Sequence, residues 1–73
     1  MSTNRTFALA ENEEFIQLNQ LLKIEGIAQT GGHAKILIDE GEIQVNKEVE
    51  HRIRRKCRKG DIVSFEDIQI EIV

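Results

Sequence analysis

The chain has 73 residues and a net charge of −3; 40% of its residues are hydrophobic and 32% are charged. This length makes one small domain with a thin core, and the composition excludes a disordered tail. No apolar run approaches the roughly 20 residues that span a bilayer, a single cysteine excludes an internal disulfide, and the polar start is unlike a secretory signal. We therefore expect a cytoplasmic protein that makes no contact with a membrane.

The first part of the chain predicts a short strand and then a helix. Residues 5–9 are consistent with the strand. Residues 13–25 carry apolar side chains at helical spacing, with acidic side chains near the start, where the helix dipole favours them. Gly26 follows at the position where a left-handed residue commonly ends a helix.

A second helix is predicted from Gly31 or Gly32 to Glu40. Thr30 is a suitable N-cap because its hydroxyl can accept a hydrogen bond from a free backbone N–H, and Gly41 ends the helix. The glycine pair has two interpretations. It either forms a tight turn between the helices or lets a phosphate approach bare backbone N–H groups at the start of the helix.

After this helix the apolar period changes from 3.6 to 2, which is typical of strands. The predicted strands, paired as two hairpins, are residues 42–45 with 48–50 and residues 62–65 with 68–72. Asn46-Lys47 and Glu66-Asp67 supply the turns. The order of elements predicts an α+β domain in which a pair of helices packs on a small antiparallel or mixed β-sheet.

Residues 52–59 read Arg-Ile-Arg-Arg-Lys-Cys-Arg-Lys and hold six of the ten basic side chains. Residues 1–51 carry nine acids and four bases, and residues 60–73 carry four acids and no base. An acidic chain that concentrates its positive charge in one segment attracts polyanions to that segment. Nucleic acid is therefore the first partner to consider.

An extended backbone over residues 50–58 would sort these side chains onto two faces, at intervals of roughly 6.6 Å. The cationic face would carry Arg52, Arg54, Lys56 and Arg58. The other face would carry Ile53, Arg55, Cys57 and Lys59. The cationic spacing is close to that of successive phosphates. A charged sheet edge that prevents aggregation is the alternative, but such an edge needs one or two lysines and not four arginines.

Other positions are less informative. Lys23 and Lys35 either extend the positive surface or are ordinary solvated lysines, and His33 either contacts phosphate or has no special role. Cys57 is expected to be a small core side chain. The chain shows no metal-ligand spacing, acid–base pair or phosphate-binding loop, so we expect no enzyme, cofactor or metal site. With no Trp or Tyr and three Phe, stacking of single-stranded bases is poorly supported.

Three stretches of the chain, residues 22–28, 34–47 and 59–63, read LKIEGIA, AKILIDEGEIQVNK and KGDIV. In this order they resemble the RNA-binding domain first described in ribosomal small-subunit protein four, called the S-four domain or alpha-L RNA-binding motif. The resemblance runs from about Phe15 to Phe65. As a stand-alone domain of this length, the chain is similar to the small bacterial YbcJ-like proteins.

The resemblance implies a module in which structured RNA contacts the second helix, the loop before it and nearby basic side chains. By matching position, Lys23, Thr30 and Lys35 take this role. The chain reads Gln-Leu-Asn at residues 17–19, where the family often has Arg-Leu-Asp, and Thr-Gly-Gly at residues 30–32, where it often has Ser-Arg-Ser. Two customary arginines are absent, so the basic run is expected to supply the charge instead.

The sequence therefore predicts a single non-catalytic RNA-binding domain over residues 1–73, with its core motif at about residues 15–65. It is expected to be a monomer that binds structured RNA such as rRNA or tRNA, with the ribosome as a further expected partner. The predicted RNA-binding residues are Lys23, Thr30, His33, Lys35, Arg52, Arg54, Arg55, Lys56 and Arg58. The alternatives are a protein-interaction module with an acidic partner and an accessory subunit of an RNA-modifying enzyme.

Overall fold

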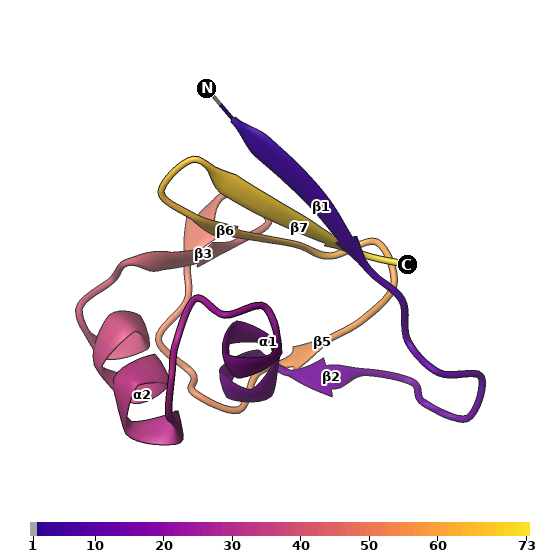
Figure 1. Cartoon of the computed structure of the whole chain (residues 1–73), viewed down its shortest axis with the longest axis horizontal. Coiled ribbons are helices and arrows are strands. Elements are labelled where there is room, and N and C mark those ends of the chain that lie inside the picture. The colour runs from indigo at the N-terminus through magenta and orange to yellow at the C-terminus, as the bar shows by residue number, and fades with distance from the viewer. Residues whose placement is uncertain (1) are drawn as a thin grey trace.

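A helix pair lies against one face of a twisted sheet in the computed structural model, which describes residues 2–73 (Figure 1). The helices are α1 (Leu18–Ile24) and α2 (Gly31–Asp39). The strands are β1 (Thr3–Phe7), β2 (Ile16–Gln17), β3 (Ile43–Val45), β4 (Glu48–Val49), β5 (Lys56–Cys57), β6 (Ile62–Phe65) and β7 (Ile68–Ile72).

The main sheet has five strands in the order β1-β7-β6-β3-β4. The edge strand β1 runs parallel to β7, and every other neighbouring pair is antiparallel. The predicted α+β class, with a helix pair on a mixed sheet, is confirmed. Strands β2 and β5 form a separate antiparallel ribbon of two strands, in which Ile16 pairs with Cys57 and Gln17 with Lys56.

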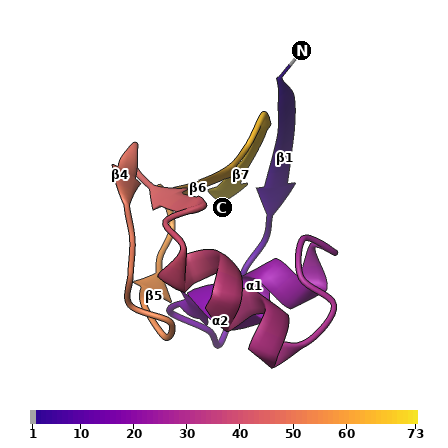
Figure 2. The same cartoon turned by 90° about the vertical axis from the view of Figure 1, so that its left-hand side faces the viewer.

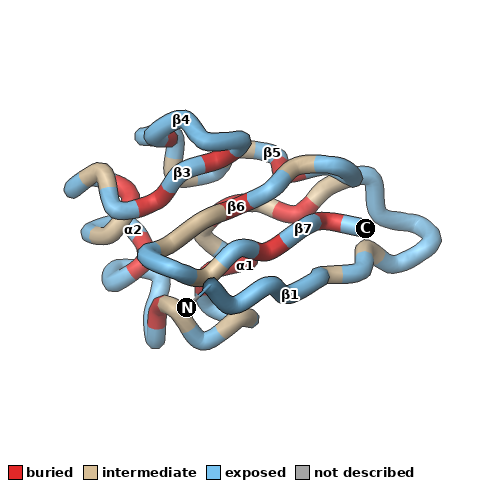
Figure 3. The backbone as a smooth tube through the Cα atoms, turned by 90° about the horizontal axis from the view of Figure 1, so that it is seen from above, coloured by how far each residue is buried: buried red, intermediate tan, exposed pale blue. Residues whose placement is uncertain are grey.

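The core lies between the sheet and the helices, because each strand turns alternate side chains inward. In β7 the side chains of Ile70 and Ile72 are buried, while Gln69 and Glu71 are exposed. Figure 3 shows the buried positions along β3, β6, β7 and α1, whereas most of β1 is exposed. The buried apolar side chains are Ile16, Leu18, Leu21, Leu22, Ala28, Ala34, Ile38, Ile43, Val45, Cys57, Val63, Ile70 and Ile72.

The second helix and both hairpins form where the sequence predicted them. The Thr30 hydroxyl accepts a hydrogen bond from the His33 backbone N–H at 3.0 Å, so Thr30 is the N-cap. Gly41 follows the helix with a φ of +78°. Asn46 and Lys47 have φ values of 53° and 72°, which is the left-handed geometry of a two-residue hairpin turn.

Two predictions for the N-terminal part were wrong in their bounds. The first strand occupies Thr3–Phe7 rather than residues 5–9, because its register is set by pairing with β7. The first helix begins at Leu18 rather than near residue 13. The backbone of residues 16–17 instead pairs with β5, and a residue in strand pairing cannot also join the helical hydrogen-bond ladder.

Candidate nucleic-acid interface

The basic segment, defined here as residues 52–59, is not a single extended strand, which was the condition for sorting its side chains onto two faces. The Arg55 N–H donates to the carbonyl oxygen of Arg52 at 3.2 Å and closes a turn, and only Lys56–Cys57 is a strand. Exposure alternates as expected over residues 52–58. Arg52, Arg54, Lys56 and Arg58 are exposed, whereas Ile53 and Arg55 are half-buried and Cys57 is buried. Lys59, expected on the same face as Cys57, is exposed as well.

The backbone of this segment is held by the start of α1. The N–H groups of Leu18 and Asn19 donate to the carbonyl oxygens of Arg55 and Ile53, at 2.9 Å and 3.1 Å. The first N–H groups of a helix need acceptors from outside the helix, and Gln17 provides no side-chain cap here. The basic segment therefore serves as the cap of α1, which fixes its position on the domain.

Glu50 anchors the segment from inside. Its carboxylate, in a residue only 8% exposed, accepts hydrogen bonds from the Arg52 N–H, from Nε and Nη2 of Arg52 and from Nη1 of Arg55, at 2.8–3.1 Å. The Arg52 side chain is the main reason that the pKa of Glu50 is lowered from 4.5 to about 2. Burial alone would raise this pKa, but Arg55 lowers it further.

Asp61 anchors the other end of the segment. One carboxylate oxygen accepts a hydrogen bond from the Arg58 N–H at 2.8 Å, and the other accepts one from the Asn46 amide at 2.9 Å. Nη2 of Arg55 lies 3.9 Å from the same carboxylate. Burial alone would raise the pKa of Asp61, but these donors and the nearby arginines outweigh it and lower the pKa.

Four of the six cations remain without an acidic partner. Glu50 and Asp61 together balance Arg52 and Arg55. Within residues 2–73, no carboxylate lies within 4.0 Å of the charged groups of Arg54, Lys56, Arg58 and Lys59. An open hollow of about 560 Å³ is lined by Arg52, Arg54, Arg55 and Lys56. Its chemistry suits a phosphate, because every lining side chain is cationic.

Phe15 lies against the basic segment, a relationship that sequence reasoning missed. Nζ of Lys56 is 5.0 Å from the centroid of its ring, and Cζ of Arg58 is 5.7 Å from it. Both distances fall within the range of cation–π contact. The contact depends on the pairing of β2 with β5, which joins segments far apart in the chain, so no local sequence pattern could have indicated it.

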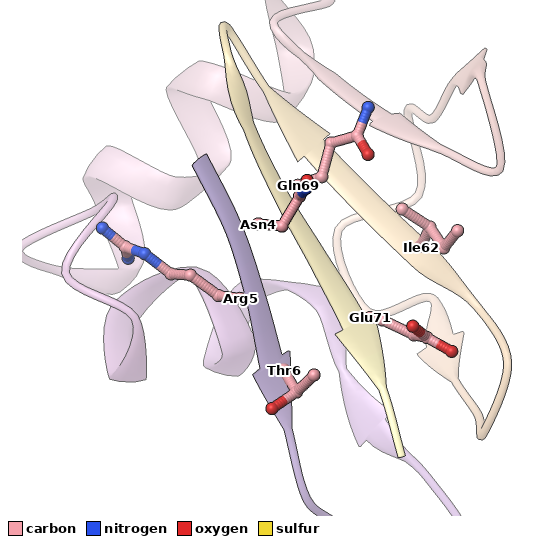
Figure 4. Close-up of a pocket in the computed structure, with 6 residues that line it drawn as sticks. All are labelled: Asn4, Arg5, Thr6, Ile62, Gln69 and Glu71. Carbon is pink, nitrogen blue, oxygen red and sulfur yellow. The ribbon is translucent and has the colours of Figure 1, made fainter. Parts of the chain in front are cut away.

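A second hollow, of about 330 Å³, lies over the main sheet at β1, β6 and β7 (Figure 4). Its lining residues are Asn4, Arg5, Thr6, Ile62, Gln69 and Glu71. Figure 4 shows Arg5 directed away from the other labelled side chains, and its Nη1 donates to the carbonyl oxygen of Glu25 at 3.1 Å. This surface has no other cationic side chain in its lining, so it is a poorer fit for a polyanion than the basic segment.

Cys57 lies in the core, as predicted, and burial is the main cause that raises the pKa of its thiol to about 11. In the part of the chain that the structure describes, no cluster of three or more His, Cys, Asp or Glu side chains could hold a metal ion. No helix over the same residues is long and apolar enough to cross a membrane.

A family model described as "S4 domain" matches residues 9–73. The chain belongs to the S4 domain family. This match confirms the resemblance to the S-four RNA-binding domain that the sequence indicated.

Two curated relatives and one solved structure are similar to this S4 domain. "Putative RNA-binding protein YbcJ" of Escherichia coli is 40% identical over 68 residues, covering 93% of the chain and 96% of the relative. "Probable ribosome maturation protein RlbA" of Bacillus subtilis is 43% identical over 53 residues, or 73% of the chain and 75% of the relative. The solution structure of YbcJ from Escherichia coli, described as an alpha-L motif involved in RNA-binding, covers 100% of the chain and matches over 91% of its own length, with a TM-score of 0.71.

The predicted binding residues of this S4 domain fall into two groups. Lys23 lies in the last turn of α1, Thr30 and His33 lie at the start of α2, and Lys35 lies in the middle of α2. We call these four residues the helix-loop group. Figure 2 shows the loop between the helices and the strand β5 at opposite ends of the helix pair. The structure therefore separates this helix-loop group from the basic segment, which α1 contacts through its first residues.

The side chains of the helix-loop group differ in whether their polar groups are free to contact RNA. The Thr30 hydroxyl is already used as the cap of α2. Nδ1 of His33 accepts a hydrogen bond from the Gln29 N–H at 3.3 Å, which leaves Nε2 as the nitrogen open to a ligand. Lys23 and Lys35 are exposed. Gly31 and Gly32 lie in the first turn of α2, and neither has a positive φ, so the left-handed residue between the helices is Gly26.

Proposed function

We propose that this chain is a non-catalytic module that binds structured RNA through phosphate and shape contacts. The observation that carries the proposal is the basic segment, in which Arg54, Lys56 and Arg58 present unpaired cations from an anchored backbone. Family membership and the names of YbcJ and RlbA support the same activity. Further contacts are proposed for Lys23, Thr30 and His33, at the other end of the helix pair, and for Lys35, in the middle of α2.

Anchoring matters because binding otherwise has to immobilise the residues that make contact. The hydrogen bonds to Glu50, Asp61 and the start of α1 already fix the backbone of the segment. Arg54 and Arg58 can then offer their planar forks to phosphates, while Lys56 acts as a compact charge. Arg52 and Arg55 support the segment and add to its positive potential.

We further propose rRNA, within a ribosome or its precursor, as the target rather than tRNA. The support is the relative RlbA, whose name assigns it to ribosome maturation. We propose that the protein acts in the cytoplasm as a monomer. A double-helical part of the RNA suits a protein surface of this kind, since A-form helices are recognised mainly by backbone and shape.

A salt titration tests the proposal. We would measure the affinity of the full chain for a fluorescein-labelled RNA hairpin at several salt concentrations, for the wild type and for Lys56→Gln with Arg58→Gln. For every phosphate that the variant no longer neutralises, the slope of log affinity against log salt should fall by about 0.7–0.9. Unchanged affinity and slope in the double variant would reject the basic segment as the RNA-binding site.

A control of equal charge for the single variant Lys56→Gln separates a local effect from a change of net charge. Lys47→Asn removes one positive charge from the hairpin turn, and asparagine tolerates the positive φ of that position. It should leave the affinity nearly unchanged. Capture of partners from a nuclease-treated extract tests the alternative function. An acidic protein retained after the RNA is removed would favour a protein-interaction module. Crosslinking in cells, followed by sequencing of the bound RNA, identifies the target.

A further inference from the structure

The β2–β5 ribbon has an outer face that the phosphate contacts above do not fully use. Ile16 pairs with Cys57 and both are buried, so alternation turns the next pair, Gln17 and Lys56, outward. Continuing the same alternation by one residue places Phe15 and Arg58 on the outer face as well. The distances from Lys56 and Arg58 to the Phe15 ring agree with this arrangement. The outer face thus combines an aromatic ring, an amide and two cations.

Two cations lie beside the single Phe15 ring. Nζ of Lys56 and Cζ of Arg58 lie 5.0 Å and 5.7 Å from one ring centroid. No carboxylate within residues 2–73 lies within 4.0 Å of either group, so both cations are available to an anion bound beside the ring. The ring itself is half-buried, so part of it stays open to solvent.

A hollow of about 410 Å³ adjoins the same ring. Its lining residues are Asn12, Glu13, Glu14, Phe15, Ile16, Gln17 and Gln20. The volume is within the range of pockets that hold small ligands, roughly 300–1,000 Å³. Its amides can both donate and accept hydrogen bonds, as the edge of a nucleobase requires. The carboxylates of Glu13 and Glu14 repel phosphate from the hollow but can accept hydrogen bonds from the amino groups of a base.

We propose that this face is a site for one unpaired nucleotide of the bound RNA. Lys56 and Arg58 move aside from the Phe15 ring, the base stacks on the ring with its edge toward Gln17 and Gln20, and the two cations contact the adjoining phosphate. The site rests on the proposed RNA-binding function and adds to it a preference for RNA with a bulged or looped-out base. Among the three phenylalanines in the described residues, Phe15 is the one with cations within cation–π distance of its ring. Stacking of one base on an aromatic ring corresponds to roughly a ten-fold change in affinity.

The test compares two RNA hairpins that differ only in one bulged nucleotide, which carries 2-aminopurine. The chain has no Trp or Tyr, so emission of the probe can be read without interference from the protein. The wild type should bind the bulged hairpin about ten-fold more tightly than the paired one and change the probe emission. Phe15→Leu keeps the apolar bulk but removes the ring, so it should lose the emission change and bind the two hairpins equally.

Phe65→Leu is the matched control, because it makes the same substitution at a half-buried phenylalanine on β6. It should keep the preference for the bulged RNA, and thermal unfolding checks that both variants are folded. Equal binding of the two hairpins by the wild type, with no emission change, would overturn the nucleotide site and leave the RNA-binding function standing. If Phe15→Leu weakened binding of both hairpins equally and kept the preference, Phe15 would have a structural role and would not stack on a base. Binding to neither hairpin would overturn the function and the site together.

Discussion

Glu50 and Arg52 are joined by two parallel hydrogen bonds, from Nε to Oε2 at 3.0 Å and from Nη2 to Oε1 at 3.1 Å. The carboxylate belongs to a buried residue, whereas the arginine side chain is 73% exposed. Such a bidentate pair fixes the orientation of both groups. Arg52 therefore holds the basic segment in place from the outside, a contact that its position in the sequence did not indicate.

The first prediction concerns the pH dependence of stability through Glu50. The folded pKa of about 2 is below the ordinary value of 4.5, so the ionised carboxylate stabilises the fold above about pH 4.5. This contribution is lost as the pH falls through the folded pKa. Glu50→Gln should lower the free energy of unfolding at pH 7 by about 1–2 kcal/mol, after allowance for solvent screening. Urea unfolding at several pH values measures it.

The difference between wild type and Glu50→Gln should shrink as the pH is lowered from 5 toward 2, because the wild-type carboxylate then becomes neutral as well. Glu48→Gln, at an exposed position of β4, is the control and should have little effect at any pH. A difference for Glu50→Gln that stays constant across this range would contradict the assigned ion pair.

The second prediction separates Arg52 from Arg54. Arg52→Ala removes the main partner of Glu50, so it should lower the thermal unfolding temperature and weaken RNA binding indirectly. Arg54→Ala removes an exposed cation that has no acidic partner among the described residues, so it should leave the unfolding temperature unchanged. For Arg54→Ala, the plot of log affinity against log salt concentration should become shallower by about 0.7–0.9. Calorimetry and a salt titration check the pair, and equal unfolding temperatures for both variants would argue against the anchoring role of Arg52.

Local sequence signals account well for α2 and the hairpins. Thr30 caps the helix, Gly41 follows it with a positive φ, and Asn46-Lys47 forms the turn that the alternating strands require. Each of these features depends on residues within a few positions of one another. The family resemblance then placed the helix pair on the sheet.

Contacts between distant residues explain what the sequence did not predict. The start of α1 depends on β5, because the carbonyl oxygens of Ile53 and Arg55 accept its first N–H groups. The apolar pattern of Phe15 and Ile16 fits a helix as well as a strand, and only the partner strand decides between them. Likewise, a count of charges could not distinguish Arg52 and Arg55, which Glu50 and Asp61 together balance, from the unpaired Arg54.

The third prediction concerns Asn46, which links the β3–β4 hairpin to β6. Its Oδ1 accepts a hydrogen bond from the Ile62 N–H at 2.9 Å, its Nδ2 donates to Asp61 at 2.9 Å, and its φ is 53°. Asn46→Gly removes the side-chain bonds but tolerates the backbone, and should cost about 1 kcal/mol. Asn46→Ala adds the penalty for a left-handed alanine and should cost about 2–3 kcal/mol in urea unfolding. Equal costs would show that the backbone conformation contributes nothing.

The fourth prediction concerns Cys57. Because its pKa is raised to about 11 by burial, the native thiol is protonated at pH 8 and should not react with Ellman's reagent until urea unfolds the chain. The raised pKa also means that the contribution of the buried thiol to stability is present below about pH 9 and is lost as the pH rises toward 11.

Cys57→Ser buries a hydroxyl and should lower the free energy of unfolding by about 1–3 kcal/mol, more than Cys57→Ala if the hydroxyl finds no partner. Rapid labelling of the native protein would contradict the buried position.

The last prediction compares the exposed cations of the helices with those of the basic segment. Lys23→Gln with Lys35→Gln removes two exposed charges from the helices, and Lys56→Gln with Arg58→Gln removes two from the basic segment. We expect the second pair to weaken binding of the RNA hairpin more strongly, because its backbone is anchored and its cations converge on Phe15. If one RNA spans both groups, the losses in binding free energy should add in the fourfold variant, since the groups share no partner. A large loss from the helical pair with none from the basic segment would instead move the interface to the loop between the helices, where the family resemblance alone would have placed it.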